Sequence, residues 1–185
     1  MCWYSRSYKK LVRLVPCLLL LAASLQSCKP DLSEAGSKAK FFDLKGYFEA
    51  DSARLTRLNP WVTKSVKHNT ETETKKVQIT NWGNELKLFT ESDINKQSWK
   101  ESYDVQSTGD FLIYKAKDPG LRTREVLIKK EGSKVKWILI FNHTKNILYE
   151  NVEKLSYYPD SLYLIQKLQR VRLLGTQKYT IKGVF

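Results

Sequence analysis

The second half of this 185-residue chain alternates apolar and polar residues with a period of two, and short turn sequences separate the alternating runs. The clearest run places Val135, Trp137, Leu139 and Phe141 at every second position, as expected of a strand with one buried face. The turn sequences hold Gly, Pro, Asn and Asp, and they are too short for a parallel crossover, which needs a dozen or more residues. This pattern predicts an antiparallel sheet in which consecutive strands are neighbours.

The same pattern divides most of the chain into strands and turns. Strands are expected around 99–105, 111–115, 126–128, 135–141, 147–157, 162–173 and 178–185. The turns between them are expected at 107–110, 118–120, 131–133, 142–144, 159–160 and 175. Two earlier segments rich in Val and Thr, 61–68 and 71–80, also favour extended structure.

Two helices are predicted before the run of strands. The apolar residues of the first recur at helical spacing: Phe41, Leu44, Phe48, Leu55 and Leu58. Asn59-Pro60 ends this helix, because the residue before a proline avoids the helical conformation. Asn81 can cap a second helix, which continues to about Asp93 with apolar residues spaced four and three apart at Trp82, Leu86 and Phe89.

Together these elements predict an α+β fold. We expect one globular domain, residues 40–185, in which the two helices pack on one face of a strongly curved antiparallel meander of about eight strands. This shape resembles the open half-barrel of the lipoprotein carriers and acceptors at bacterial outer membranes. The resemblance concerns architecture, and a fold does not by itself determine a function.

The N-terminus has the pattern of a secretory signal peptide. Four cations and no acid precede the apolar segment 14–25, which is too short to span a bilayer as a stable helix. We expect residues 1–27 to be this signal. The polar segment 28–39 that follows is expected to be a flexible tether to the domain.

The residues Leu25-Gln26-Ser27-Cys28 resemble the lipobox of bacterial lipoproteins. The resemblance implies cleavage between Ser27 and Cys28, a diacylglycerol on the Cys28 thiol, and fatty acids such as palmitate as the anchor. Gln26 is bulkier than the residue usual at its position. The other two cysteines, Cys2 and Cys17, lie in the signal, so Cys28 would have no disulfide partner within the mature chain. An ordinary signal or an uncleaved anchor is the alternative.

The segment ELKLFTESDINK, residues 85–96, resembles uncharacterised lipoproteins of Bacteroidota. These resemblances imply a cell-envelope protein, lipid-anchored in the outer membrane of a diderm bacterium. They leave the periplasmic and surface faces of that membrane as alternatives.

The net charge of +13 is strongly basic. A basic protein often binds nucleic acid, but export argues against that partner. Anionic lipid, phosphorylated glycolipid and acidic polysaccharide remain, and solubility alone also explains such a charge. Lys167, Arg170 and Arg172 are expected to form the face that turns toward lipid.

Residues suited to catalysis are scarce. His68 and His143 are the only histidines and lie far apart in the sequence. There is no nucleophile elbow, no zinc-ligand spacing and no glycine-rich phosphate loop. We therefore predict no enzyme activity, no metal and no cofactor.

The chain is rich in aromatic residues, which can line a ligand cavity or fill a core. Five of them are the candidates for a cavity between the second helix and the sheet: Trp82, Phe89, Trp99, Tyr103 and Trp137. The predicted function is a membrane-anchored, non-catalytic binding module for an amphiphile, a glycan or a partner protein. The alternative is a structural or assembly accessory lipoprotein with a solid core and no ligand. Ligand identity and oligomeric state remain open.

Overall fold

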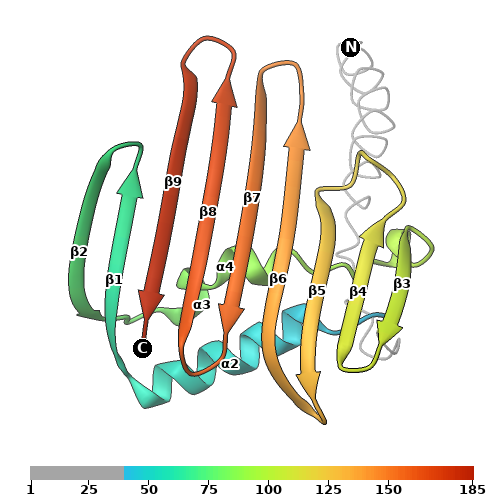
Figure 1. The fold of residues 1–185 in the computed structure, drawn as a ribbon, viewed down its shortest axis with the longest axis horizontal. Coiled ribbons are helices and arrows are strands. Elements are labelled where there is room, and N and C mark those ends of the chain that lie inside the picture. Colours follow the sequence, from blue (N-terminus) through green and yellow to red (C-terminus); the bar gives the residue numbers. More distant parts are fainter. Residues whose placement is uncertain (1–39) are drawn as a thin grey trace, which may run out of the picture. The chain divides into compact units, whose positions relative to one another are not determined.

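Nine antiparallel strands form one open sheet in the computed structural model, which describes residues 40–185. The strands lie in the order β2-β1-β9-β8-β7-β6-β5-β4-β3 (Figure 1). In chain order they are β1 (Trp61–His68), β2 (Glu71–Gln78), β3 (Tyr103–Thr108), β4 (Phe111–Ala116), β5 (Thr123–Glu131), β6 (Lys134–Lys145), β7 (Tyr149–Tyr158), β8 (Leu162–Val171) and β9 (Gly175–Val184).

The helices lie on one face of this sheet (Figure 1). They are α2 (Leu44–Leu58), α3 (Trp82–Glu85), α4 (Lys87–Thr90) and the 3-10 turn η2 (Gln97–Trp99). The Asp43 side chain accepts a hydrogen bond of 2.8 Å from the backbone N–H of Gly46, which caps the start of α2. Asn59 ends α2 in the left-handed conformation, with φ of 43°.

The prediction of a strongly curved half-barrel of about eight strands was wrong. The sheet has nine strands and is open, because β2 and β3 each have only one neighbour. The layer over it contains one helix of 15 residues and two of four residues, which is too little to fill a deep concavity. The meander is also interrupted, because β1 pairs with the last strand, β9. The alternation of apolar and polar residues is a local pattern, so it does not predict this pairing between distant strands.

The prediction of a second helix over residues 81–93 was also wrong in its extent. The helix is broken at Leu86, where φ is −95° and ψ is 10°, so α3 and α4 have four residues each. Gly83 and Asn84 lie in α3 and Thr90 ends α4, and all three have weak helix propensity. Trp99, expected to begin a strand, lies in η2.

The turn expected at 142–144 lies inside strand β6, which continues to Lys145. The turn forms further along the chain. There the Asn146 side chain accepts hydrogen bonds from the N–H groups of Leu148 and Tyr149, at 2.9 and 2.8 Å. The segment 142–144 and the segment around Asn146 both contain turn-forming residues. Asn142 is buried within the sheet, with 1 % exposure, so the turn forms at Asn146 instead.

The core lies between the helices and the sheet. Of the eight apolar residues noted at helical spacing, Leu58 is 62 % exposed and the other seven are buried: Phe41, Leu44, Phe48, Leu55, Trp82, Leu86 and Phe89. Phe48 is central, because its ring lies 5.0 Å from that of Phe89 and 5.1 Å from that of Tyr157, measured between centroids. The Tyr157 hydroxyl donates a hydrogen bond to Asp51 of α2. Aromatic packing and a buried hydrogen bond thus fix α2 on the sheet.

The core side chains have their packing neighbours within the described part of the chain, and Ala39–Phe185 forms a compact unit of its own. Its strands also pair with one another across the whole sheet. We therefore expect the segment 40–185 to fold on its own.

Replacing Phe48 by alanine should lower the free energy of unfolding by about 3–5 kcal/mol, because it leaves a cavity between three elements. Chemical denaturation of segment 40–185 measures this change. Leu58→Ala is the matched control: Leu58 lies in the same helix but is 62 % exposed, and a change within about 0.5 kcal/mol is expected. Equal effects of the two substitutions would contradict the packing described.

Candidate functional site: the open face of the sheet

Within residues 40–185 the helices lie over one face of the sheet, and none of them lies over the other face across β5 to β9 (Figure 1). Successive side chains of a strand point to opposite faces. Val126, Ile128, Ile138 and Ile140 are buried under the helices, so the residues between them point to the uncovered side. We call this uncovered surface of β5 to β9 the open face.

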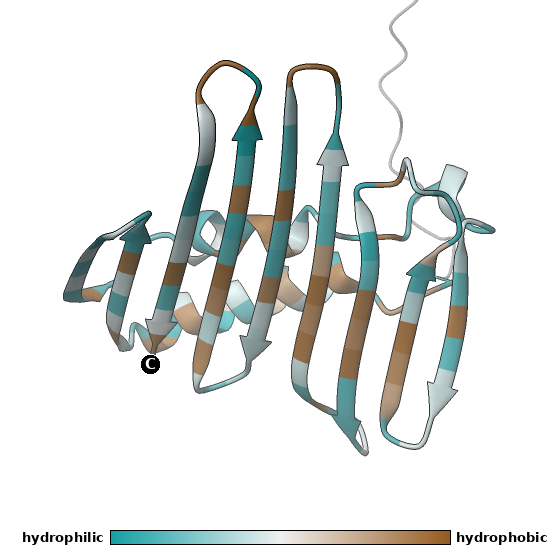
Figure 2. Cartoon of the chain, turned by 45° about the horizontal axis from the view of Figure 1, so that its top comes forward, coloured by the Kyte–Doolittle hydropathy of each residue, from teal (hydrophilic) through white to brown (hydrophobic). Residues whose placement is uncertain are grey.

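The open face carries apolar side chains that pair across neighbouring strands. Leu127 of β5 lies opposite Leu139 of β6, and Val152 of β7 lies opposite Leu168 of β8. These four side chains are half-buried without any helix above them. Figure 2 shows the apolar bands on β5 and β6. The strands here are therefore apolar on both faces, as is usual for a strand that is covered on both sides.

A polar row crosses the open face between these apolar pairs. Phe141 lies opposite Lys154, Lys154 opposite Gln166, and Gln166 opposite Thr180, on β6 to β9. The row therefore presents an ammonium, an amide and a hydroxyl group next to one another, and each of them can donate a hydrogen bond.

Two adjacent hollows lie along this surface, with volumes of about 450 and 380 Å³. Both are lined by Lys154 and Gln166, so the two hollows adjoin at the polar row. We call the two hollows together the groove. The first hollow is also lined by Glu125, Leu127, Leu139 and Phe141, and the second by Val152, Leu168, Lys178 and Tyr179. Such volumes are within the range of small-molecule sites.

The groove has an excess of positive charge. Among residues 40–185, no carboxylate lies within 4.0 Å of the ammonium groups of Lys154 and Lys178. The acid of the groove, Glu125, lies 3.5 Å from the Lys115 ammonium. An anionic group entering the groove would therefore meet two cations that have no acidic partner in the described part of the chain.

The five aromatic residues predicted to line a cavity do not lie together. Trp82, Phe89 and Tyr103 are fully packed in the core under the helices. Trp99 packs beside Tyr103, at 6.4 Å between ring centroids. Trp137 lies on the other face, 5.9 Å from the Phe111 ring. The concavity in which they were expected to meet is absent because the sheet is not strongly curved.

The three cations expected on one lipid-facing surface are also divided. Lys167 points to the helix side of the sheet, where its ammonium lies 3.9 Å from Glu153. Arg170 lies three positions further along β8, so its side chain points to the opposite face and lies 3.4 Å from Glu150. Arg172 lies beyond the end of β8.

The candidate catalytic groups form no cluster with acid–base geometry. The His143 ring N–H donates one hydrogen bond of 3.0 Å to the Glu150 carboxylate, and the His68 ring stacks on Tyr179 with centroids 4.5 Å apart. Within residues 40–185 no group of three or more His, Cys, Asp or Glu side chains could hold a metal ion.

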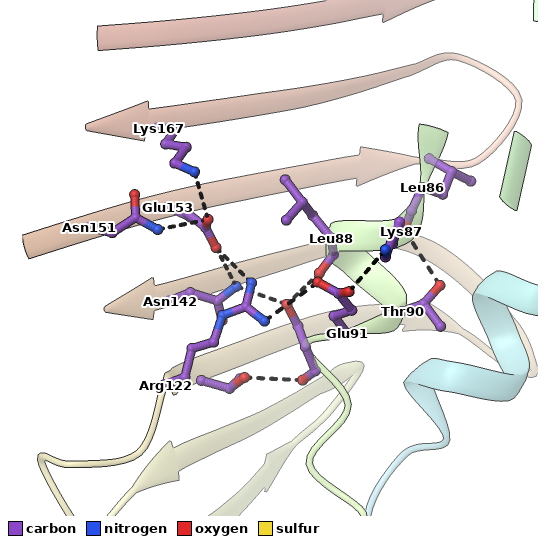
Figure 3. Close-up of polar contacts among 12 residues, drawn as sticks. Leu86, Lys87, Leu88, Thr90, Glu91, Arg122, Asn142, Asn151, Glu153 and Lys167 are labelled. Carbon is purple, nitrogen blue, oxygen red and sulfur yellow. Dashed lines mark hydrogen bonds and ion pairs between the residues drawn. The ribbon is translucent and has the colours of Figure 1, made fainter. Parts of the chain in front are cut away.

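A buried polar cluster around Glu153 is the second concentration of charge (Figure 3). Glu153 is 2 % exposed. Its carboxylate accepts hydrogen bonds from Arg122 at 3.0 Å, Asn142 at 3.2 Å and Asn151 at 2.9 Å. Asn142 also donates to the Ser92 hydroxyl, at 2.9 Å. The cluster thus joins β6 and β7 to the segment that follows α4, and we assign it a structural role.

Burial would raise the pKa of Glu153, but hydrogen bonds from Asn151, Arg122 and Asn142 lower it below the ordinary value of 4.5. A carboxylate with a lowered folded-state pKa contributes stability that is complete above its unfolded pKa. That contribution is lost as the pH falls through the folded-state pKa. The cluster therefore stabilises the fold at neutral pH and ceases to do so in acid.

Glu153→Gln should lower the free energy of unfolding at pH 7 by about 1.5–3 kcal/mol, the contribution of hydrogen bonds to a charged group. The variant should lose less stability than the wild type when the pH is lowered from about 5 to about 3. Denaturation at several pH values measures both effects. Glu49→Gln, at an exposed i,i+4 pair with Lys45, is the control and should follow the wild-type profile. A parallel loss in Glu153→Gln and wild type would show that Glu153 is not the titrating group.

Comparison of the chain with protein-family models, with curated proteins and with solved structures finds no match. Within residues 40–185 no helix is long and apolar enough to cross a membrane. The residues of the lipobox and the tether lie outside the described part of the chain, so cleavage at Ser27 and acylation of Cys28 remain predictions.

The groove was missed at the sequence level although a signal for it exists. The buried face of β6 was predicted wrongly: Ile138 and Ile140 are the buried residues, and Trp137, Leu139 and Phe141 lie on the open face. Residues 137–141, WILIF, are in fact apolar at every position. A strand with one solvent-facing side should alternate, so an unbroken apolar run indicates that both sides carry apolar groups. The run predicts an apolar open face, but it does not reveal which cations flank it.

Proposed function

We propose that this chain is a lipid-anchored, non-catalytic binding protein of the bacterial cell envelope that holds an anionic amphiphile in the groove of its open face. The observation that carries the proposal is the combination of apolar pairs with Lys154 and Lys178. An acyl chain would lie along Leu127, Leu139 and Leu168, which line the groove, and a phosphate or carboxylate would bind the two ammonium groups.

The polar row gives the occupant an orientation. Gln166 and Thr180 flank Lys154 in register and can donate hydrogen bonds to the oxygens of an acidic headgroup. The apolar pairs lie on either side of this row, so alkyl chains have surface in both directions. Charge-assisted hydrogen bonds to the headgroup would supply most of the specificity for an anion.

The anchor belongs to the same proposal. A diacylglycerol-modified Cys28 would hold the domain at a membrane, where anionic amphiphiles are concentrated. The outer membrane of a diderm bacterium, on either its periplasmic or its surface side, is the proposed location. Neither a metal nor a cofactor enters the proposal.

A structural or assembly accessory lipoprotein is the second candidate. The filled core under the helices favours it, because the largest fully buried side chains, among them Trp82 and Tyr157, occupy the space between the layers. Such a protein would act through its surface and bind no small ligand.

Segment 40–185 should bind a monomeric short-chain anionic lipid, dihexanoylphosphatidylglycerol, and discriminate against its choline counterpart. Lys154→Glu combined with Lys178→Glu should weaken binding at least tenfold, because each charge-assisted hydrogen bond contributes about 1.5–3 kcal/mol. Isothermal titration calorimetry below the critical micelle concentration measures the affinity.

The matched control is Lys117→Glu combined with Lys134→Glu. It makes the same change in net charge at residues that do not line the groove, and it should bind like the wild type. Equal affinity for both lipids, or equal loss in the two double variants, would contradict the groove as an anion site. Absence of binding to either lipid would favour the accessory role.

Cys28→Ser in the full-length chain, expressed in a diderm host, should abolish labelling by radioactive palmitate, because serine lacks the thiol to which the diacylglycerol is attached. Its precursor should accumulate uncleaved. The control is Cys17→Ser, within the expected signal, which should be labelled and processed normally. Palmitate incorporated into the Cys28→Ser protein would contradict the lipobox assignment.

A further inference from the structure

The hairpins β6–β7 and β8–β9 rise beyond the rest of the sheet, and their two turns lie at the same end (Figure 1). Each turn carries a pair of exposed aliphatic side chains. Ile147 and Leu148 are 83 % and 68 % exposed, and Leu173 and Leu174 are 93 % and 74 % exposed. Figure 2 shows hydrophobic residues in both turns, in brown. We call these four residues the apolar tips.

The backbone holds the apolar tips beside each other. The N–H of Arg172 in one turn donates a hydrogen bond of 3.0 Å to the carbonyl of Leu148 in the other. Each turn is also closed internally, by the N–H of Asn146 bonding to Tyr149 at 2.9 Å and the N–H of Leu174 bonding to Val171 at 3.1 Å. These bonds hold the two turns side by side, so the four exposed side chains lie at one end of the sheet instead of being scattered singly over the surface. We call this end of the sheet the apolar patch.

Cations surround this patch. Lys145 ends β6 next to the first turn, and Arg172 lies in the second. The nearby acid, Glu150, is bonded to His143 at 3.0 Å and lies 3.4 Å from Arg170. The segment from Ser161 to the C-terminus contains no Asp or Glu. The end of the two hairpins is therefore apolar at its apex and positive around it.

We propose that the apolar tips insert into the interfacial region of an anionic lipid bilayer, with Lys145 and Arg172 bound to its acidic headgroups. An apolar apex with basic residues behind it matches the polarity of a membrane surface, where acyl chains lie beneath phosphates. The inference is independent of the groove, because the tips and the groove residues do not overlap.

A second copy of the chain fits this surface poorly. Two copies meeting tip to tip would bring Lys145 and Arg172 of each against the same cations of the other. Four aliphatic side chains also fall far short of the roughly 20–30 residues per partner that a stable protein interface uses. A bilayer requires neither a large matched surface nor an acidic partner protein.

Segment 40–185 contains no cysteine, so one introduced cysteine can carry a fluorescent reporter. Leu173→Cys labelled with the environment-sensitive dye NBD should shift to shorter wavelength on vesicles of phosphatidylglycerol and phosphatidylcholine in equal parts. It should not shift on pure phosphatidylcholine. Lys134→Cys, in the β5–β6 hairpin, is the matched labelling site and should show no shift on either vesicle.

Vesicle co-sedimentation of unlabelled protein gives the affinity. Serine at all four apolar tips should weaken binding to the anionic vesicles at least tenfold. The double variant Lys145→Glu and Arg172→Glu should also weaken binding at least tenfold, and its binding should depend much less on salt. Leu58→Ser, at a leucine of α2 that is 62 % exposed, should bind like the wild type. Thermal unfolding of each variant shows that it has folded.

The double variant Lys154→Glu and Lys178→Glu distinguishes membrane insertion of the tips from ligand binding in the groove. It should lose ligand binding in the groove and keep the NBD shift on anionic vesicles. Wild-type protein that ignores anionic vesicles, or tip variants that bind them equally well, would overturn the proposal. So would sedimentation that shows a dimer in the wild type and a monomer in the serine variant, because the tips would then bind a second copy.

Discussion

Phe48 packs against Phe89 of α4 and Tyr157 of β7, and with the Tyr157–Asp51 hydrogen bond this contact holds a thin helical layer on one side of a nine-stranded sheet. The layer has only one helix of more than four residues. This layer therefore buries the apolar side chains on one face of the sheet and does not bury those on the other face. The groove on the open face is a direct consequence of this one-sided packing.

Ion pairs lie on both faces of the sheet, and two lysines of the open face take no part in them. On the open face, Arg170 lies 3.4 Å from Glu150, and Glu125 lies 3.5 Å from Lys115. On the helix side, Lys64 is paired with Glu85 at 2.8 Å, and Arg122 is paired with Glu153 at 3.0 Å. On the open face, Lys154 and Lys178 have no acidic partner in the part of the chain that the structure describes. Solubility alone requires that cations be exposed, but it does not require them to lie between apolar side chains. Their placement is what favours an anionic amphiphile.

Local features of the fold could be predicted from the sequence. The strand Trp61–His68 and the end of α2 before Asn59-Pro60 have the expected bounds, because proline and alternation act within a few residues. The strong curvature that was predicted is absent, and the β1–β9 pairing and the broken second helix were not predicted. The curvature and the β1–β9 pairing depend on which distant segments meet in the folded protein. The break in the second helix depends on the balance between weak helix propensity and burial of Trp82 and Phe89.

The candidate site was predictable only in part. Aromatic residues were correctly noticed as numerous, but Trp82 and Phe89 serve the core, and the groove is lined mainly by aliphatic side chains and lysines. Alternation reveals which residues share a face of one strand. It does not tell which face the helices cover, nor that Lys154 lies opposite Gln166. Register across five strands is a property of the folded sheet.

We propose that the open face, and not the interior, binds a ligand. Native mass spectrometry of the full-length protein, purified from its host membranes in mild detergent, tests this proposal. We expect one co-purified anionic amphiphile per chain, beyond the covalent anchor, and its loss from protein carrying Lys154→Glu and Lys178→Glu. A wild-type spectrum with only the anchored chain, or an amphiphile that persists in the double variant, would contradict it.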